Sequence, residues 1–566
     1  MYLKDTTEKG GRSVSSELYG KPDVSCFNDG DVPPKVDDDD NPLLERLFQL
    51  LQMLFEFKRS TEDPNTDPDG SADRATLDFQ HWASKANHAR GQTVSYALSM
   101  FESTPRVFCF SVVVIGKFAR FVRWDRAGAI ASERFDWTSS GLMEEFLWRF
   151  SHMSRAQRGF DTSVVPPSPA EVKMVKRVFQ KAKSDRRDIP YPTEGETFSK
   201  FYIWDKDGKQ HAVIAGLPQT RPWSMTGRST FGYVGVDVET EAIVFLKDTW
   251  RIAVPGMPRE GDIYTRLQDN DVPHLPDYRY GGDVPVMCPL PSPAPHTIRP
   301  DPPPGPHGDH CKSCSPDPEV VAEWEIPPTD PFAVQRTVTQ DSAKCTWACE
   351  TAHLAEHVHY RIVLGKVGRK LKTFRFTKQF CQALFDALIC HTAAYKLGVL
   401  HRDLSAGNIM IDEDGRGMLI DWDLCMEVLL QAARRFWRTG TWQFISADLL
   451  RKPFSRVHLL RDDLESLVHV LFHHMLRYRP AGFLTVELAT NLQAVFDAHT
   501  VVNGQARGGD QKAFYLSGGG YFGPSTLINS TLHRPLVALM NALRELFFYI
   551  YTDEELLRRF PASMVE

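Results

Sequence analysis

The sequence predicts an α+β protein with two domains, and three observations indicate this class. The chain has 566 residues, of which 42% are hydrophobic and 11% aromatic, so it can form more than one buried core. Runs rich in Val, Ile and Phe, typical of strands, are interspersed with segments whose apolar residues recur at helical spacing. The pattern divides into two blocks, which predict a smaller α/β domain over residues 15–165 and a larger domain over residues 170–566.

The smaller domain is expected to combine strands with two helices. Residues 1–14 are polar and are expected to be disordered. After them, "KPDVSCF" is predicted as a strand, "DDDDNP" as an acidic break, and the end of the apolar "LFQLLQMLFEFKRS" as a second strand. The next segments are predicted in order as a helix, two paired strands and an amphipathic helix: "SKANHARGQTVSYALSMF", "RVFCFSVVVIG", "KFARFVRWDR" and "GLMEEFLWRFSHM".

The larger domain is expected to begin with a helix and continue with strands. "AEVKMVKRVFQKAK" predicts the helix, and "TFSKFYIWD" and "KQHAVIAG" predict two strands joined by a hairpin turn. Residues 281–331 are too rich in Pro to hold helix or sheet, so they predict a disordered insertion. Beyond them, "HYRIVLGKVG" predicts a strand, and "FTKQFCQALFDALICHTAAYKLG" and "RDDLESLVHVLFHHMLR" predict two buried helices.

Charge and cysteine content limit the compartment and the partners. The formal net charge is −6, so nothing global argues for binding to nucleic acid or to an anionic membrane. No apolar run approaches the ~20 residues that span a bilayer, and the polar start lacks the apolar core of a signal peptide. Ten Cys residues without regular spacing fit a reducing compartment. We therefore expect a cytoplasmic or nuclear protein with no membrane partner.

The stretch "HRDLSAGNIMIDEDGRGMLIDWDLC", residues 401–425, carries the residue types that phosphoryl transfer needs. That chemistry requires a base near the acceptor hydroxyl and oxygen ligands for Mg²⁺. Asp403 and Asn408 lie five positions apart on one predicted loop, and Asp421 follows a predicted strand after a turn. A hairpin of this length can bring Asn408 and Asp421 together around a metal, which leaves Asp403 to face the acceptor. The alternative is a solvated turn whose acidic residues occur by chance.

This stretch resembles the catalytic loop and metal-binding Asp of protein kinases. Together with "HYRIVLGKVGRKL", "RTGTWQFISADLL" and "RDDLESL", it is similar to the fungal-type protein kinase family over most of the chain. The resemblance implies a bilobal protein-kinase-like domain for residues 170–566. It also implies an enzyme that uses ATP and Mg²⁺ to phosphorylate Ser/Thr hydroxyls of an unidentified protein substrate, with Asp403 as the catalytic base.

The resemblance also indicates which residues would hold the nucleotide. "GRSTFGYV" fits a glycine-rich loop, with Ser229 in the middle glycine place. Lys247, at the end of the strand "AIVFLK", is expected to hold the α- and β-phosphates, with Glu260 as its partner on a helix. The alternatives are a surface role for Lys247 and Asp262 as the acidic partner. The loop residues implied as nucleotide-binding are Gly227, Ser229, Gly232 and Val234.

One kinase feature is missing from the catalytic loop. Ser/Thr kinases place a Lys two residues after the catalytic Asp, but this chain has Ser405 there, and Gly407 supplies no Arg instead. Asp423 also replaces the Gly of the Asp-Phe-Gly triplet. This pattern is similar to aminoglycoside and choline phosphotransferases, so a small-molecule phosphotransferase on the same fold is one alternative. A pseudokinase that serves as a binding module is another.

The N-terminal domain resembles the PD-(D/E)xK nuclease superfamily, which implies a restriction-endonuclease-like fold. In that chemistry two carboxylates hold Mg²⁺, and a Lys positions or activates the attacking water. Asp23 ends a Pro-Asp pair, and alternation along "EFK" puts Glu56 and Lys58 on one strand face. A spacing of four puts Gln92 and Tyr96 on one helix face. The alternative is a strand pair that places no metal, and nucleic acid is expected as a partner only if this domain is an active nuclease.

Overall fold

The computed structural model describes most of both predicted domains. The described residues are 1–5, 11–12, 19–20, 23–28, 51–65, 80, 83–193, 195–222, 224–253, 257–286, 333–342, 355–427, 440–453, 455–479, 484–502, 505–518 and 532–552.

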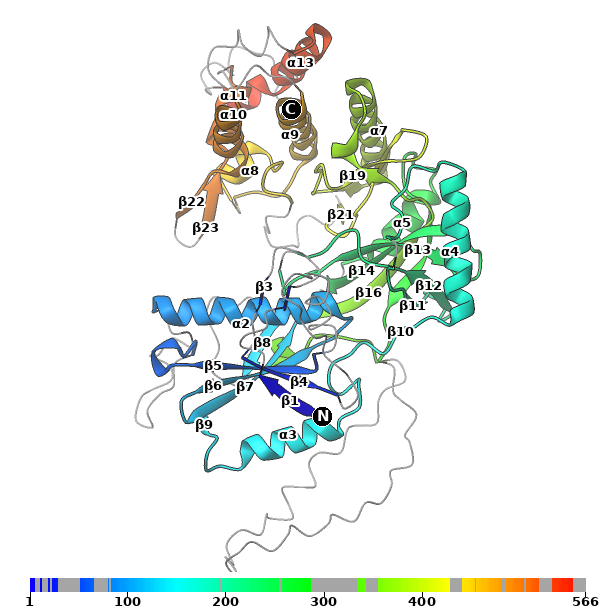
Figure 1. Cartoon of the computed structure of the whole chain (residues 1–566). Helices are drawn as coiled ribbons and strands as arrows, with labels where there is room; N and C mark the ends of the chain where they lie inside the picture. The colour runs from blue at the N-terminus through cyan, green and yellow to red at the C-terminus, as the bar shows by residue number, and fades with distance from the viewer. Residues whose placement is uncertain are drawn as a thin grey trace, which may run out of the picture.

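The N-terminal domain has three layers, with a mixed sheet between two helices (Figure 1). Its strands run in the order β1-β4-β5-β6-β7-β8, and β9 also pairs with β7. β5 and β6 are parallel, and α2 lies in the crossover that parallel neighbours need. The bounds are β1 (Tyr2–Asp5), β4 (Val24–Phe27), β5 (Met53–Lys58), α2 (Ser84–Ser103), β6 (Cys109–Ile115), β7 (Phe118–Asp125), β8 (Gly128–Ala131), β9 (Phe135–Asp136) and α3 (Leu142–His152).

Strand β6 explains why both faces of this sheet are covered. Its sequence "CFSVVVI" is apolar at almost every position, so both of its faces must be buried. Val113 packs in one core cluster with Tyr96 and Met100 of α2. Val112 packs in a second cluster with Phe150 of α3. The alternation of side chains along the strand therefore assigns one helix to each face of the sheet.

The expected disorder of residues 1–14 is wrong for residues 2–5. These residues form β1, which pairs antiparallel with β4 and places Tyr2 opposite Phe27. A polar segment carries no periodic apolar signal, but its backbone N–H and C=O groups can satisfy those of an edge strand. Backbone pairing, rather than side-chain hydrophobicity, therefore accounts for this strand.

The larger domain has two lobes, and the first is an antiparallel sheet with helices α4 and α5. Its strand order is β10-β11-β12-β13-β14-β16-β15. Helix α4 begins with a capping box between Ser168 and Glu171, with Pro at its first turn. The bounds are β10 (Val164–Val165), α4 (Pro169–Ser184), β11 (Ser199–Trp204), β12 (Gln210–Ala215), β13 (Phe231–Asp237), β14 (Ile243–Ile252), α5 (Glu260–Gln268), β15 (Tyr278–Asp283) and β16 (His357–Leu364).

The Pro-rich insertion expected from residue 281 begins later than that. Residues 280–283 belong to β15 and pair with β16, and Pro285 forms an isolated bridge with Val334. The neighbouring strand offers a complete set of backbone partners, so the two glycines at 281 and 282 continue the sheet. Residues 287–332 lie outside the described part of the chain.

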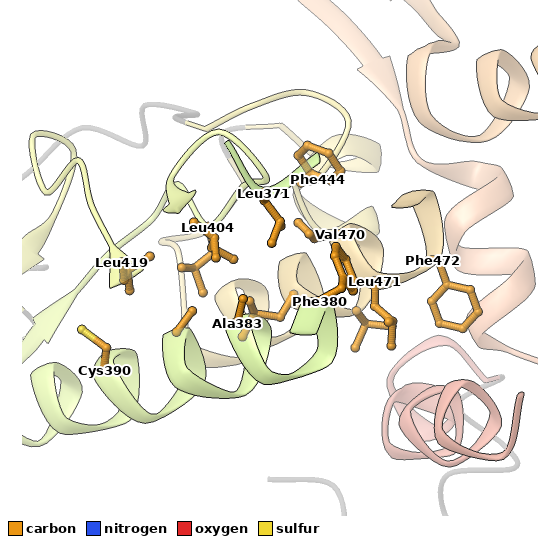
Figure 2. Close-up of a cluster of buried hydrophobic side chains, with 14 of the residues drawn as sticks. Leu371, Phe380, Ala383, Cys390, Leu404, Leu419, Phe444, Val470, Leu471 and Phe472 are labelled. Atoms are coloured by element: carbon orange, nitrogen blue, oxygen red, sulfur yellow. The ribbon is translucent and has the colours of Figure 1, made fainter. Parts of the chain in front are cut away.

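The second lobe is mainly helical, and its core lies between α7 and α9. Figure 2 shows Phe380 and Ala383 of α7 pointing toward the same cluster as Val470 and Leu471 of α9. The helices are α7 (Thr377–Lys396), α8 (Ala447–Arg451), α9 (Leu460–Tyr478), α10 (Thr485–Leu492), α11 (Asp510–Leu516) and α13 (Arg534–Tyr551). The strands are β17 (Arg369–Lys370), β18 (Val399–Leu400), β19 (Ile409–Ile411), β20 (Gly417–Leu419), β21 (Met426–Glu427), β22 (His499–Val502) and β23 (Gln505–Gly508). Of the helices that the structure describes, none has the length and apolar character to cross a membrane.

Buried charges join the N-terminal domain to the first lobe. Asp161, just beyond α3, accepts a hydrogen bond from Arg361 of β16 at 2.6 Å, and both side chains are almost fully buried. Asp125 of β7 accepts the backbone N–H groups of Val338 and Thr339 at 2.9 and 3.1 Å. The two domains therefore share buried polar contacts and are not joined only by a linker.

Candidate active site

The loop that carries Asp403 is anchored by a buried carboxylate on α9. Asp463 accepts the backbone N–H of Arg402 at 3.0 Å, and it hydrogen-bonds His391 and His458 at 2.8 Å each. Arg402 has φ +68°, a conformation that is strained for a residue with a side chain. The contact with Asp463 holds this strained residue in place and fixes the backbone immediately before Asp403.

The side chain of Asp403 is oriented by the segment that follows it by almost forty residues. Thr441 donates both its backbone N–H and its hydroxyl to Asp403 Oδ1, at 2.8 and 3.0 Å. Within the described part of the chain, these bonds use one carboxylate oxygen and leave Oδ2 to face an acceptor. Asp403 is only 8% exposed, so its carboxylate cannot rotate freely and keeps one orientation.

The predicted hairpin between the two metal-ligand candidates is confirmed. β19 and β20 pair antiparallel with Ile409 opposite Leu419, and the backbone N–H of Ile420 donates to the carbonyl of Asn408 at 2.9 Å. The amide nitrogen of Asn408 donates to the carbonyl of Asp403 at 2.8 Å. That bond fixes the amide so that its oxygen, the atom a hard cation would use, points the other way.

Lys247 lies at the centre of a cluster of three carboxylates. Its ammonium contacts Glu260 of α5 at 2.7 Å, and Asp421 and Asp423 at 2.8 Å each. The predicted pairing of Lys247 with Glu260 therefore agrees with the structure, while Asp262 is instead paired with Arg259 at 3.2 Å. The sequence predicts Asp423 only as a departure from a motif, although the repeat of Asp at positions i and i+2 in "DWD" is a signal for a second carboxylate at this point.

The ionisation of this cluster is divided between its carboxyls. Burial, and then the proximity of Asp423, raise the pKa of Glu260 well above its usual range. Burial also works against charge on Asp423, but Lys247 and Arg228 hold the pKa of Asp423 well below its usual range. Burial likewise opposes charge on Lys247, and the surrounding carboxylates outweigh it and raise the pKa of Lys247. The lysine therefore stays cationic.

Asp421 is held by its backbone in an uncommon conformation. It has φ +66°, and its N–H donates to the hydroxyl of Tyr264 on α5 at 3.3 Å. Such strained backbone persists where surrounding contacts enforce it, and it is frequent at functional sites. The conformation directs the carboxylate of Asp421 back toward Lys247.

The predicted glycine-rich loop lies beside this cluster, but only Gly227 and Ser229 precede β13; Gly232 and Val234 belong to that strand. Gly227 has φ +89° and Ser229 has φ +41°, so the backbone there takes the left-handed conformation at two nearby positions. Gly232 lies directly opposite Lys247 in the β13–β14 pairing. Val234 lies opposite Phe245 and packs in a cluster with residues of α4.

The carboxylates at this point could hold a divalent metal ion. Oxygen atoms of Glu260, Asp421 and Asp423 all lie within 4.8 Å of one another. Carboxylate oxygens are the ligands that Mg²⁺ prefers, and this donor set contains no thiol or imidazole that would favour a softer metal. Asp421 and Asp423 therefore fit Mg²⁺, while the two oxygens of Glu260 are engaged by Lys247 and by the N–H of Trp422.

The five candidate residues of the N-terminal domain form one connected cluster. Lys58 donates to Glu56 at 2.5 Å and to Gln92 at 2.7 Å, and Gln92 donates to the hydroxyl of Tyr96 at 2.7 Å. Asp23 accepts the backbone N–H of the residue between Glu56 and Lys58 at 2.7 Å. Glu56 is 1% exposed, and burial raises its pKa to about 7 despite the opposing effect of Lys58. Its Oε2 has no hydrogen-bond partner among the described residues.

Comparisons with known proteins concern mainly the larger domain. A family model described as fungal protein kinase matches residues 74–475. A stretch of 120 residues is 30% identical to serine/threonine-protein kinase PLK4 of Nematostella vectensis; it covers 21% of this chain and only 12% of that relative's length. The solved structure "ROP18 kinase domain in complex with AMP-PNP and sucrose" matches 68% of this chain and 90% of its own, at 10% identity and a TM-score of 0.31. These matches give no support to the nuclease resemblance.

Proposed function

The chain belongs to the fungal protein kinase family, and on that premise we propose that it transfers the γ-phosphoryl group of ATP to Ser/Thr hydroxyls of a protein substrate. The observation that carries this proposal is the assembled cluster of Lys247, Glu260 and Asp421, with contacts of 2.7 and 2.8 Å. In protein kinases, phosphoryl transfer requires this lysine–glutamate pair and a metal-binding Asp to be in place together.

Each of the remaining site residues has a role in such a reaction. Asp403 accepts the proton of the acceptor hydroxyl while the hydroxyl oxygen attacks the γ-phosphorus and the bond to the β–γ bridging oxygen breaks. Thr441 keeps Asp403 in one orientation through its two hydrogen bonds. Lys247 holds the α- and β-phosphates, and Glu260 positions Lys247. Asn408, Asp421 and Asp423 would hold Mg²⁺, which when bound neutralises charge on the phosphates.

Two further features support a protein substrate over a small molecule. Thr441 belongs to "GTWQFISADLL", which resembles the substrate-docking end of a kinase activation segment, and it hydrogen-bonds the catalytic base Asp403. The partial match to a serine/threonine-protein kinase, at 30% identity over 120 residues, favours the same acceptor class. A small-molecule phosphotransferase and an inactive binding module remain the competing functions.

The test is phosphate transfer from labelled ATP with Mg²⁺ to generic protein substrates and to the chain itself. We compare the wild type with Asp403→Ala and with Asp414→Ala, which removes an exposed Asp from the β19–β20 turn. Label on protein that is lost only in Asp403→Ala supports the proposal. ATP turnover only with small hydroxyl or amine acceptors favours the small-molecule enzyme, and a folded chain that binds no ATP favours the binding module.

A second candidate function concerns the N-terminal domain. We propose a Mg²⁺-dependent hydrolytic site of the PD-(D/E)xK type, because Glu56, Lys58 and Gln92 are joined by hydrogen bonds of 2.5 and 2.7 Å around a buried carboxylate. Glu56 and Asp23 would hold the metal, and Lys58 would position the attacking water. The test is DNA cleavage in the presence of Mg²⁺ by the full chain. Cleavage that is lost in Lys58→Ala but kept in Asp403→Ala supports this site, and no cleavage under any condition contradicts it.

A further inference from the structure

The catalytic loop carries no Lys or Arg at residues 404–408, the positions that follow Asp403. Ser405 stands two residues after Asp403 and is 2% exposed, and Gly407 follows it. The charge that develops on a transferring phosphoryl group is stabilised by cations held in place beforehand. A working site on this chain therefore needs a cation from another element.

Arg228 reaches this site from the loop between β12 and β13. Its Nη1 lies 3.1 Å from Asp423 and 3.4 Å from Asp421, the two carboxylates that also contact Lys247. The charges of Asp421 and Asp423, together with that of Asp403, outweigh burial and raise the pKa of Arg228. Arg228 is thus within electrostatic reach of the catalytic base and of both metal-ligand carboxylates.

The backbone around Arg228 is fixed in a way that aims the side chain at the site. The carbonyl of Arg228 accepts the N–H of Trp250 at 2.7 Å and the hydroxyl of Thr249 at 3.1 Å, both from β14. The residues on either side of Arg228 have positive φ, which turns the chain sharply at this point.

The N-terminal domain supports the same loop from the other side. The carbonyl of Arg126 accepts the N–H of Gly227 at 2.8 Å, and its guanidinium donates to the hydroxyl of Ser229 at 3.1 Å. Met225, four residues before Ser229, packs in the core cluster of the N-terminal domain. The position of Arg228 is therefore set by two domains, and it does not depend on a loosely held loop.

We propose that Arg228 binds the γ-phosphate and supplies the cation that Ser405 cannot. This inference deepens the proposed function and rests on it. In the reaction Arg228 exchanges a carboxylate for phosphate oxygens, which its planar guanidinium can bind through two parallel hydrogen bonds. The acceptor oxygen forms a bond to phosphorus, the bond to the leaving ADP oxygen breaks, and the proton passes to Asp403. Arg228 keeps its proton throughout.

The first test compares equilibrium binding of ADP and of AMP-PNP, which retains a γ-phosphate. Arg228→Met removes the charge and keeps most of the side-chain length. We expect it to weaken AMP-PNP binding at least 10-fold while ADP binding changes less than 2-fold. Arg177→Met serves as the control, because Arg177 of α4 pairs with Glu241 at an exposed position and should leave both affinities unchanged. Equal weakening of both nucleotides would mean that Arg228 only neutralises Asp421 and Asp423, and would overturn the proposal.

The second test asks whether a cation at the usual position can replace Arg228. We expect Arg228→Met to lower the transfer rate about 100-fold. Adding Ser405→Lys to that variant should raise its transfer rate at least 10-fold. If the introduced lysine perturbs turnover, nucleotide binding replaces it as the measurement. We then expect the Arg228→Met, Ser405→Lys double variant to regain tighter binding of AMP-PNP than of ADP. Unchanged transfer in Arg228→Met would overturn this proposal alone. A wild type that binds neither nucleotide would overturn it together with the proposed function.

Discussion

The hydrogen bond between Glu260 and Trp422 is one of the contacts that join the two lobes. The backbone N–H of Trp422 donates to Glu260 Oε1 at 3.1 Å, while the other oxygen of Glu260 accepts Lys247 at 2.7 Å. Trp422 is fully buried, and its ring packs against His401 at a centroid distance of 4.6 Å. The glutamate therefore couples Lys247 to the loop that carries Asp403, and movement of α5 would disturb both.

The first prediction concerns the oxygen of Glu260 that faces Lys247. Glu260→Gln keeps an oxygen for the N–H of Trp422 but turns an amide NH₂, which can only donate, toward the ammonium of Lys247, so Lys247 loses the acceptor that α5 supplies. We expect phosphoryl transfer to fall about 100-fold with a small change in unfolding free energy. Steady-state transfer and urea unfolding measure the two effects. Asp262→Asn, on the exposed side of the same helix, is the control, and equal loss of activity in both variants would contradict the role of Glu260.

The second prediction concerns Asp463, which is fully buried and bonded to two histidines and one backbone N–H. Asp463→Ala leaves His391, His458 and the strained Arg402 without their shared acceptor. Removing one partner of a buried charged network costs about 3–5 kcal/mol. We expect a loss of that size in urea unfolding. Asp510→Asn removes an exposed acid from α11 and should change stability by less than about 0.5 kcal/mol; a comparable loss in both variants would argue against the anchor.

The third prediction concerns the buried pair between Asp161 and Arg361. Asp161→Ala leaves the guanidinium of Arg361 buried with only part of its charge compensated, at a cost of about 3–5 kcal/mol. Arg361→Met with Asp161→Ala removes both charges, so we expect the double variant to be less destabilised than the sum of the single variants. A double-mutant cycle by thermal or urea unfolding measures this coupling. Additive losses would mean that the two residues act independently.

Local sequence accounts for the part of the site that was predicted. The β19–β20 hairpin follows from an apolar run on each side of a short turn, and Asn408 and Asp421 flank its paired strands. Gly417 is required on that hairpin because a Cβ there would collide with the backbone of Ala383 on α7. The family resemblance supplied the pairing of Lys247 with Glu260, and the family and the α+β, bilobal kinase-like fold are confirmed.

The rest depends on contacts that no local pattern encodes. Arg228 and Asp423 lie 195 positions apart in the chain and meet only because the loop after β12 is held by β14 and by the N-terminal domain. Thr441 is 38 positions from Asp403. Strand β1 was not predicted, because it is stabilised by backbone pairing with β4 and its polar side chains show no strand pattern. These features depend on contacts between residues that are far apart in the sequence, and residue type alone does not predict them.

The last prediction is a pH dependence at Glu56. Burial raises the pKa of this carboxyl from 4.5 to about 7, so between these two values the folded chain binds more protons than the unfolded chain. Stability that comes from the neutral carboxyl is present at low pH and is lost as pH rises through about 7. A shift of this size corresponds to about 3 kcal/mol. We expect Glu56→Gln to remove this decline, whereas Glu144→Gln, at an exposed position on α3, should keep it.

The carboxyl of Glu56 must lose its proton to bind a metal ion, so protons and metal ions compete for this group. We would measure the affinity for Mn²⁺ from its effect on thermal unfolding of the full chain carrying Asp421→Asn and Asp423→Asn. As the pH rises toward about 7, this affinity should increase up to 10-fold per pH unit, and above about 7 it should level off. Those two substitutions remove the acidic ligands of the site in the larger domain, so the remaining effect reports on Glu56. Binding that does not change between pH 5 and 8 in this background, or that is unaffected by Glu56→Gln, would contradict a metal site in the N-terminal domain.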